Sequence, residues 1–352
     1  MSAIYLYAIM PNSSSSNVIW AMTGIDPAHP KVYTIEKQNI AALVSDTEQH
    51  HFQGLTQEEV LSRLVVHQQV IEGAMQHTPL LPVQFGTTFN HKNDIERLLQ
   101  QHALPFEQQL NKFQSLVQLE VVALWDPQTV LQSIAQMPEI VAHKTSLSQQ
   151  SIITEADQIA LGQQVKRLFD ERRTQIGHTI LSKVREFAVD TINNPCQDDM
   201  MIVNLALLLE RTSLSAVEDC IDALDLHFDS ELSFRLIGPL PAHSFATLYV
   251  DQPIYQEIDA ARQCLGLSEA VSQHQIKQTY HHLATQAHPD RQVQGTSLDL
   301  LTPMEEINGA YQLLEQYAAA QPIVANSDDE LVHFDQDHVD QTIFATFQRM
   351  VG

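Results

Sequence analysis

The sequence predicts an α+β fold: two α+β domains joined by a long helical segment, then a small all-α helical bundle and an acidic tail. Three observations lead to this prediction. Strand-like and helix-like segments mix over the first 125 residues without regular βαβ alternation. One long helical stretch follows at residues 148–190, and two short amphipathic helices come after residue 265. The expected domains are residues 1–140, residues 141–250 with the long helix, residues 251–322 and residues 323–352.

Short strands and one capped helix open the first domain. Residues 3–9 are apolar and aromatic, which is typical of a strand, and residues 32–36 and 40–45 form a predicted hairpin. A helical period then starts at Thr56, whose side chain makes a capping box with Glu59. Because no regular βαβ unit occurs, these strands favour an antiparallel or mixed sheet.

Residues 80–89, Leu-Leu-Pro-Val-Gln-Phe-Gly-Thr-Thr-Phe, are the stretch around which this domain is organised. They are β-branched and aromatic and lie between two helical patterns, so they predict a buried strand. Pro82 and Gly86 within the stretch indicate a bulge or a close backbone approach. The preceding helix has His67 on its apolar face, and we expect a hydrogen-bonded core histidine there rather than a metal ligand.

Further elements continue to residue 250. We predict helices over residues 91–101, 106–116 and 214–227 and strands over residues 119–125, 200–209, 231–238 and 244–250. The long helical stretch concentrates the basic residues Lys166, Arg167, Arg172, Arg173, Lys183 and Arg185. A solvated helix face is the favoured interpretation of this basic segment. A contact with the chain's own acidic tail, or with an acidic partner, is the alternative.

Composition argues against several classes of function. The chain has 43 acidic and 19 basic residues and a formal charge of −24, so its surface repels nucleic acid. Its three cysteines lack zinc-binding or disulfide spacing, which indicates reduced thiols in a cytoplasmic protein. No apolar run is long enough to span a membrane, and hydrolase, transferase, phosphate-loop and dinucleotide motifs are absent. We therefore predict no enzyme activity, no cofactor, no metal and neither nucleic acid nor membrane as a partner.

Several segments together resemble one protein family. His67-Gln-Gln-Val-Ile-Glu72 precedes the stretch at residues 80–89, and residues 201–211 and 234–245 follow in the same order. These segments are similar to the GvpF/GvpL family of gas vesicle proteins, and the resemblance covers residues 4–250. It implies a gas vesicle accessory or minor structural protein that binds the small hydrophobic shell subunit. It also implies other gas vesicle accessory proteins as partners, and a role in vesicle assembly or nucleation.

A different pattern starts after residue 250. The segments Leu265-Gly-Leu-Ser268, His288-Pro-Asp-Arg291 and Glu306–Leu314 are similar to a J domain of the DnaJ type, over residues 254–318. One helix face consists of Ile276, Tyr280, Leu283 and Ala287, and a second consists of Ile307, Ala310, Tyr311 and Leu314. Two antiparallel helices would pack these faces together and display the loop between them.

The J-domain resemblance implies contact with a DnaK-type chaperone and stimulation of its ATPase. The implied contact residues are His288, Pro289, Asp290, Lys277 and Arg291. The helix before the loop departs from the J-domain pattern, because Lys277 is its one basic residue and His281 and His282 stand where basic side chains are expected. Adjacent histidines on a helix point in different directions, so we reject a metal site there. Chaperone stimulation and a J-like bundle used for another contact both stay open.

The last segment is acidic. Within residues 326–352, Val339, Ile343, Phe347 and Met350 recur at helical spacing, which predicts a short amphipathic helix. Our first functional hypothesis is a gas vesicle accessory protein, located at the vesicle, whose J-like module recruits a chaperone. The alternatives are a free J-domain co-chaperone and a scaffold in a vesicle-assembly complex.

Overall fold

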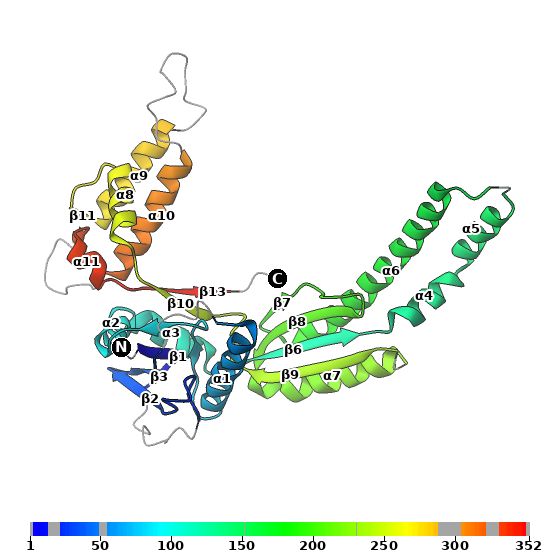
Figure 1. The fold of residues 1–352 in the computed structure, drawn as a ribbon, viewed down its shortest axis with the longest axis horizontal. Helices are drawn as coiled ribbons and strands as arrows, with labels where there is room; N and C mark the ends of the chain where they lie inside the picture. Colours follow the sequence, from blue (N-terminus) through cyan, green and yellow to red (C-terminus); the bar gives the residue numbers. More distant parts are fainter. Residues whose placement is uncertain are drawn as a thin grey trace, which may run out of the picture. The chain divides into compact units, whose positions relative to one another are not determined.

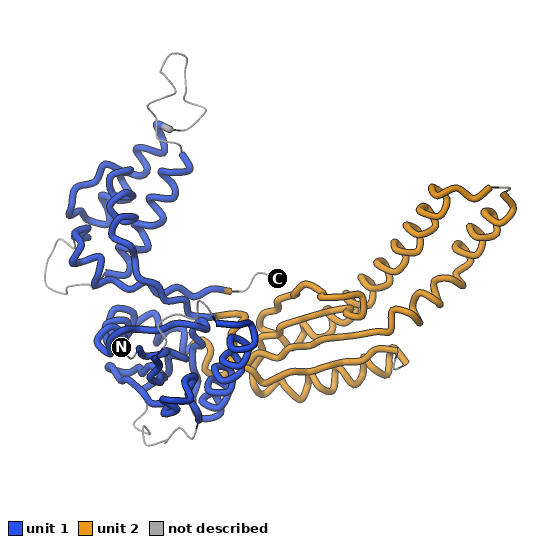
Figure 2. Tube along the Cα trace, viewed as in Figure 1, with its two compact units in different colours: residues 1–111, 247–348 blue, residues 112–246, 349–352 orange. Residues whose placement is uncertain are grey.

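The computed structural model describes residues 3–12, 22–48, 55–150, 152–229, 231–287, 304–321 and 331–349. The chain divides into two compact units (Figure 2). Unit 1 consists of residues 1–111 and 247–348, and unit 2 consists of residues 112–246 and 349–352. Both units combine helices with antiparallel sheets, which confirms the predicted α+β class (Figure 1). The predicted division into four domains stays a prediction.

Unit 1 contains a sheet built around a largely buried first strand. Its strands are β1 (Ala3–Pro11), β2 (Val32–Lys37), β3 (Ile40–Thr47), β4 (Leu81–Pro82) and β5 (Thr88–Phe89), in the order β2-β3-β1-β4 with β5 also on β1. The helices beside it are α1 (Gln57–Met75), α2 (Lys92–Gln101) and α3 (Ala103–Phe113). β2 and β3 form the predicted hairpin. α1 begins at the predicted capping box of Thr56 and Glu59, and its buried side chains join Tyr5 and Tyr7 of β1 in one apolar core.

Residues 80–89 form two short strands instead of the single predicted strand. β4 and β5 both pair with β1 in the antiparallel sense. Five residues, 83–87, separate β4 from β5, whereas only Leu6 and Tyr7 separate their partners on β1. The additional residues bulge out of the ladder at Gly86, whose φ of 93° is a left-handed conformation that favours glycine. The predicted bulge is therefore present, and it divides the strand.

Unit 2 contains a second antiparallel sheet and a long helical arm. Its strands are β6 (Leu116–Leu124), β7 (Asp190–Asn193), β8 (Met201–Glu210) and β9 (Ser233–Leu240), in the order β7-β8-β6-β9. Its helices are α4 (Pro127–Ala135), α5 (Pro138–Ser148), α6 (Glu155–Val184) and α7 (Leu214–His227), with the 3-10 helices η1 (Arg185–Phe187) and η2 (Arg211–Ser213). β6 lies centrally in this sheet, although the sequence analysis grouped it with the first strands. The arm consists of α4 and α5, which the sequence analysis did not predict, packed along α6 (Figure 1).

The rest of unit 1 is a helical bundle closed by short strands. Its helices are α8 (Tyr255–Cys264), α9 (Gln273–Ala287), α10 (Met304–Ala320) and α11 (Gln336–Gln341). β11 (Ala270–Ser272) pairs with β12 (Leu331–His333), and β10 (Thr247–Asp251) pairs with β13 (Phe344–Gln348). The predicted amphipathic helix through Phe347 is therefore wrong: α11 ends before this residue, and Phe347 lies opposite Leu248 in the β10–β13 ribbon. Pairing with β10 provides hydrogen bonds for backbone N–H and C=O groups that would lack partners at both ends of a two-turn helix.

Candidate functional site

The helices α9 and α10 form the antiparallel pair that the sequence predicts. The Gln273 side chain at the start of α9 donates a hydrogen bond to the Ala318 carbonyl near the end of α10. Tyr280 stacks on Tyr311 with ring centroids 4.0 Å apart. Ile276, Ile307, Ala310 and Leu314 are buried in the shared core, and Tyr280, Leu283 and Tyr311 pack against it. The two predicted apolar faces therefore pack against each other, as the sequence predicts.

The structure describes one of the five predicted chaperone-contact residues. Lys277 is exposed on α9, and so are His281 and His282 one turn further along. Lys277 is the one lysine or arginine of α9. The other four residues, at positions 288–291, lie outside the described residues, and the role of all five stays a prediction.

A second candidate site is an apolar groove between α5 and α6 of the arm, with a volume of about 510 Å³. It is lined by Lys144, Leu147, Ser148, Ile153, Gln158, Leu161, Gly162 and Val165. Gly162 keeps the groove open on the α6 side, because a Cβ atom at this position would meet no heavy atom within 4 Å. The same arm exposes the large apolar side chains Leu131, Val141, Ile152, Ile153 and Ile159. Exposed apolar surface of this kind is typical of an interaction site.

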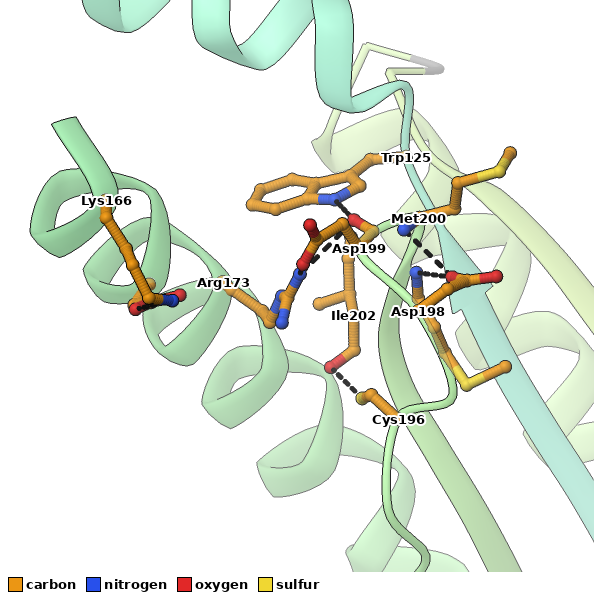
Figure 3. Close-up of polar contacts among 10 residues, drawn as sticks. Trp125, Lys166, Arg173, Cys196, Asp198, Asp199, Met200 and Ile202 are labelled. Atoms are coloured by element: carbon orange, nitrogen blue, oxygen red, sulfur yellow. Dashed lines mark hydrogen bonds and ion pairs between the residues drawn. The ribbon is translucent and has the colours of Figure 1, made fainter. Parts of the chain in front are cut away.

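An aromatic and ionic cluster fixes the root of the arm to the sheet (Figure 3). Trp125, which follows β6, packs on Phe169 of α6 with ring centroids 4.9 Å apart. The Arg173 guanidinium lies 5.1 Å from the centre of the Phe169 ring and donates to Asp199 Oδ1 at 2.9 Å. The Asp199 carbonyl accepts a hydrogen bond from Trp125 Nε1 at 2.7 Å. The helix that lines the groove is therefore anchored in the core of unit 2.

Most basic residues of α6 pair with acidic residues of the same unit. The pairs are Lys166–Asp170, Arg167–Glu171, Arg172–Glu231 and Arg173–Asp199, with N–O distances of 2.9, 2.8, 3.3 and 2.9 Å. Two of these pairs join residues one turn apart on the helix, which is the spacing that supports an exposed helix. Local pairing of this kind favours the solvated-face interpretation of the basic segment over an open basic binding patch.

A buried polar network lies beneath residues 80–89. The Tyr5 hydroxyl is 2.9 Å from His67 Nδ1 and accepts a hydrogen bond from the Gly86 N–H at 3.0 Å. Burial lowers the pKa of His67 to about 4, although a backbone hydrogen bond at Val83 opposes this shift, so the imidazole is neutral at pH 7. Burial also raises the pKa of Tyr5 above its ordinary value. The prediction that His67 is a hydrogen-bonded core histidine is confirmed.

The sequence analysis missed the groove. One wall comes from α5, which was not predicted, and the other from Gly162 and its neighbours within the long predicted helix. The available signal was the apolar pair Ile152-Ile153 directly before Thr154; the structure leaves both side chains exposed, and Ile153 lines the groove.

Comparisons with known proteins agree with the two family resemblances seen in the sequence. No helix among the described residues has the length and apolar character needed to cross a bilayer. The family described as gas vesicle synthesis protein GvpL/GvpF matches residues 3–247, and the DnaJ domain family matches residues 263–320. Neither is a catalytic family. A search of curated proteins finds no match.

Solved structures of similar fold come from two cyanobacterial proteins. The gas vesicle protein GvpF from Anabaena sp. PCC7120 matches with a TM-score of 0.56 and 20% identity, over 68% of this chain and 94% of that protein. GvpF from Microcystis aeruginosa matches with a TM-score of 0.55 and 19% identity, over 69% of this chain and 98% of that protein. At this identity the likeness concerns the fold alone.

Proposed function

The chain belongs to the GvpL/GvpF family of gas vesicle proteins and contains a DnaJ domain, and from this we propose that it is an accessory protein that assists gas vesicle assembly. In this role it binds the hydrophobic shell subunit at the vesicle, together with other accessory proteins, and keeps the subunit from aggregating before it joins the wall. The protein holds its partner without covalent chemistry. The observation that supports this role most directly, beside the family, is the apolar groove of the arm.

The groove suits one helix of an apolar subunit. It lies between α5 and α6, so a third helix can occupy it as in other helix-in-groove complexes. Ile153, Leu161 and Val165 offer apolar contacts there, and burying a side chain of this size contributes about 1.5 to 3 kcal/mol relative to exposure. Gly162 allows the backbone of the partner to come close. Lys144 at the groove supplies one polar group that can orient the bound helix.

The test is to fill the groove without disturbing the arm. Gly162→Leu adds a side chain to the open space, and leucine is a better helix former than glycine, so the arm stays folded. We expect co-purification of the shell subunit to fall at least about ten-fold, as the loss of one anchor residue does at other interfaces. The matched control is Gly309→Leu on α10, where a Cβ also meets nothing within 4 Å. Equal retention of the shell subunit by the two variants would contradict the groove as its binding site.

We propose in addition that the J-like module recruits a DnaK-type chaperone to the bound subunit. The antiparallel packing of α9 and α10 and the exposed Lys277 support this role. Asp290→Asn should abolish stimulation of the chaperone ATPase and leave binding of the shell subunit unchanged. Stimulation that persists in this variant would refute recruitment through residues 288–291.

The free co-chaperone is the second candidate, and the DnaJ match favours it. Vesicle yield in cells separates the two roles. An accessory protein loses vesicle formation with Gly162→Leu and keeps part of it with Asp290→Asn. A free co-chaperone loses its effect on vesicle yield with Asp290→Asn and keeps most of it with Gly162→Leu, because the chaperone contact would then be its main activity.

A further inference from the structure

Three side chains that can bind a metal ion lie together where β12 leads into α11. They are His333, Asp335 and His338, and one ligand atom from each lies within 4.8 Å of the other two. Among the residues that the structure describes, no other group of three or more histidine, cysteine or acidic residues meets this distance. Only His67 and the histidines of α9 were weighed as metal ligands from the sequence, so this group was not predicted.

The core of the bundle fixes the first two residues of this group. Phe334, between His333 and Asp335, is 1% exposed and stacks on Tyr317. The His333 carbonyl accepts hydrogen bonds from the Tyr317 hydroxyl at 2.6 Å and from Gln321 Nε2 at 2.7 Å, and the His333 N–H donates to Gln321 Oε1 at 3.2 Å. Because neighbouring side chains of an extended segment point to opposite faces, an inward Phe334 turns the residues on either side of it outward together.

The start of α11 brings in the third residue. Asp335 caps this helix by accepting a hydrogen bond from the His338 N–H at 3.1 Å. Its carboxylate oxygens also lie 2.8 and 2.7 Å from His338 Nδ1. The imidazole rings of His333 and His338 are nearly parallel, with centroids 4.7 Å apart. All three groups therefore converge on one small volume at the surface.

From this arrangement we propose that His333, Asp335 and His338 form a binding site for a divalent transition-metal ion such as Zn²⁺. Two imidazoles and one carboxylate are ligands that zinc accepts, whereas Mg²⁺ and Ca²⁺ prefer oxygen ligands alone. Bonds of about 2.0 to 2.2 Å to one ion require the three side chains to readjust their positions. The His338 side chain is 51% exposed and has room for this movement. Its exposure also leaves a fourth coordination position open to water.

A simpler interpretation is that Asp335 and His338 only form a helix cap and an ion pair. That interpretation accounts for the contact between these two residues, but it gives no role to the outward His333. The two interpretations differ in what His333 does, so variants at this residue decide between them.

Isothermal titration of the full chain with ZnCl₂ tests the proposal, with MgCl₂ as the comparison ion. We expect one zinc ion per chain, no comparable binding of magnesium, and at least a ten-fold loss of zinc affinity in His333→Asn and in His338→Asn. Asp335→Asn should weaken binding as well, and asparagine still caps the helix, so the fold is preserved. His281→Asn on α9 is the matched control and should bind zinc as the wild type does. Absence of zinc binding by the wild type, or unchanged binding in the His333→Asn/His338→Asn double variant, would overturn the proposal.

Discussion

Two regions of the molecule differ in which side chains they bury: one buries polar groups, and the other exposes apolar groups. Between α1 and the sheet of unit 1, the polar residues Tyr5, Tyr7, Ser45 and His67 are buried, with at most 4% of any of them exposed. On the arm of unit 2, large apolar side chains reach solvent, and Ile152 is 77% exposed. Each arrangement is the reverse of the usual distribution, in which polar groups lie outside and apolar groups inside.

We attribute a stabilising role to the buried polar groups, and the proposed association to the exposed apolar arm. The buried groups have partners within the fold: the Tyr7 hydroxyl lies 2.8 Å from Ser45 Oγ and accepts a hydrogen bond from the Ile25 N–H at 2.7 Å. A satisfied polar network of this kind specifies one arrangement of a core. The apolar side chains of the arm, in contrast, gain free energy only when something covers them. We therefore expect substitutions in the two regions to have opposite effects on unfolding and on partner binding.

The largest expected effect on stability is that of pH on the buried imidazole. The pKa of His67 is about 4 in the folded chain and about 6.5 in the unfolded chain. Between these values the unfolded state binds a proton that the folded state does not bind, so stability is complete above pH 6.5 and falls as the pH drops toward 4. The loss is on the order of 3 kcal/mol, and His102, whose pKa burial also lowers, adds to it in the same direction.

Urea unfolding at a series of pH values measures this loss. His67→Gln should flatten the dependence between pH 6.5 and 4, whereas His281→Gln on the exposed face of α9 should leave it unchanged. If the free energy of unfolding depends on pH in both variants as it does in the wild type, the buried network is not the source of the acid sensitivity. The stabilising role of that network would then be contradicted.

A smaller loss of stability is expected from Tyr5→Phe. The substitution removes the hydroxyl that contacts His67 Nδ1 and accepts from the Gly86 N–H. Leaving buried polar groups without this partner costs about 1 to 3 kcal/mol in the free energy of unfolding. Tyr311→Phe, which removes an exposed hydroxyl bonded to Glu315, should change it by less than about 0.5 kcal/mol. Equal losses in the two variants would show that burial is not what makes the Tyr5 hydroxyl important.

The smallest effect on stability is expected on the arm. Ile159→Gln replaces a side chain that is 53% exposed on α6, and glutamine is at least as good a helix former, so the free energy of unfolding should change by less than about 0.5 kcal/mol. On the same helix, Ile180 is fully buried, and Ile180→Val should cost about 0.5 to 1.5 kcal/mol. A loss with Ile159→Gln as large as that with Ile180→Val would mean that the exposed arm belongs to the core.

Local signals in the sequence predicted many elements of the fold. The predicted capping box of Thr56 and Glu59 starts α1, because this contact depends only on residues three apart. The structure adds an equivalent box of Thr154 and Asp157 at α6, which was not predicted. The apolar faces of α9 and α10 were readable for the same reason, because helical spacing repeats within a few residues. The chaperone-contact residues of the J-like module were predicted from the DnaJ resemblance. Lys277 is the one of them that the structure describes, and it is exposed.

The sequence by itself determined the α+β class, the capped helices, the J-like helix pair and the family, because each rests on short-range spacing or on ordered motifs. Tertiary structure alone decided which strands pair. β6 joins β8 from some eighty residues away, and β10 pairs with β13 near the end of the chain, because backbone hydrogen bonds between strands have the same chemistry whatever the side chains are. The groove likewise arises where α5 and α6 pack together. The cluster of His333, Asp335 and His338 spans only six residues, but the buried Phe334 and the cap of α11 decide that its side chains converge.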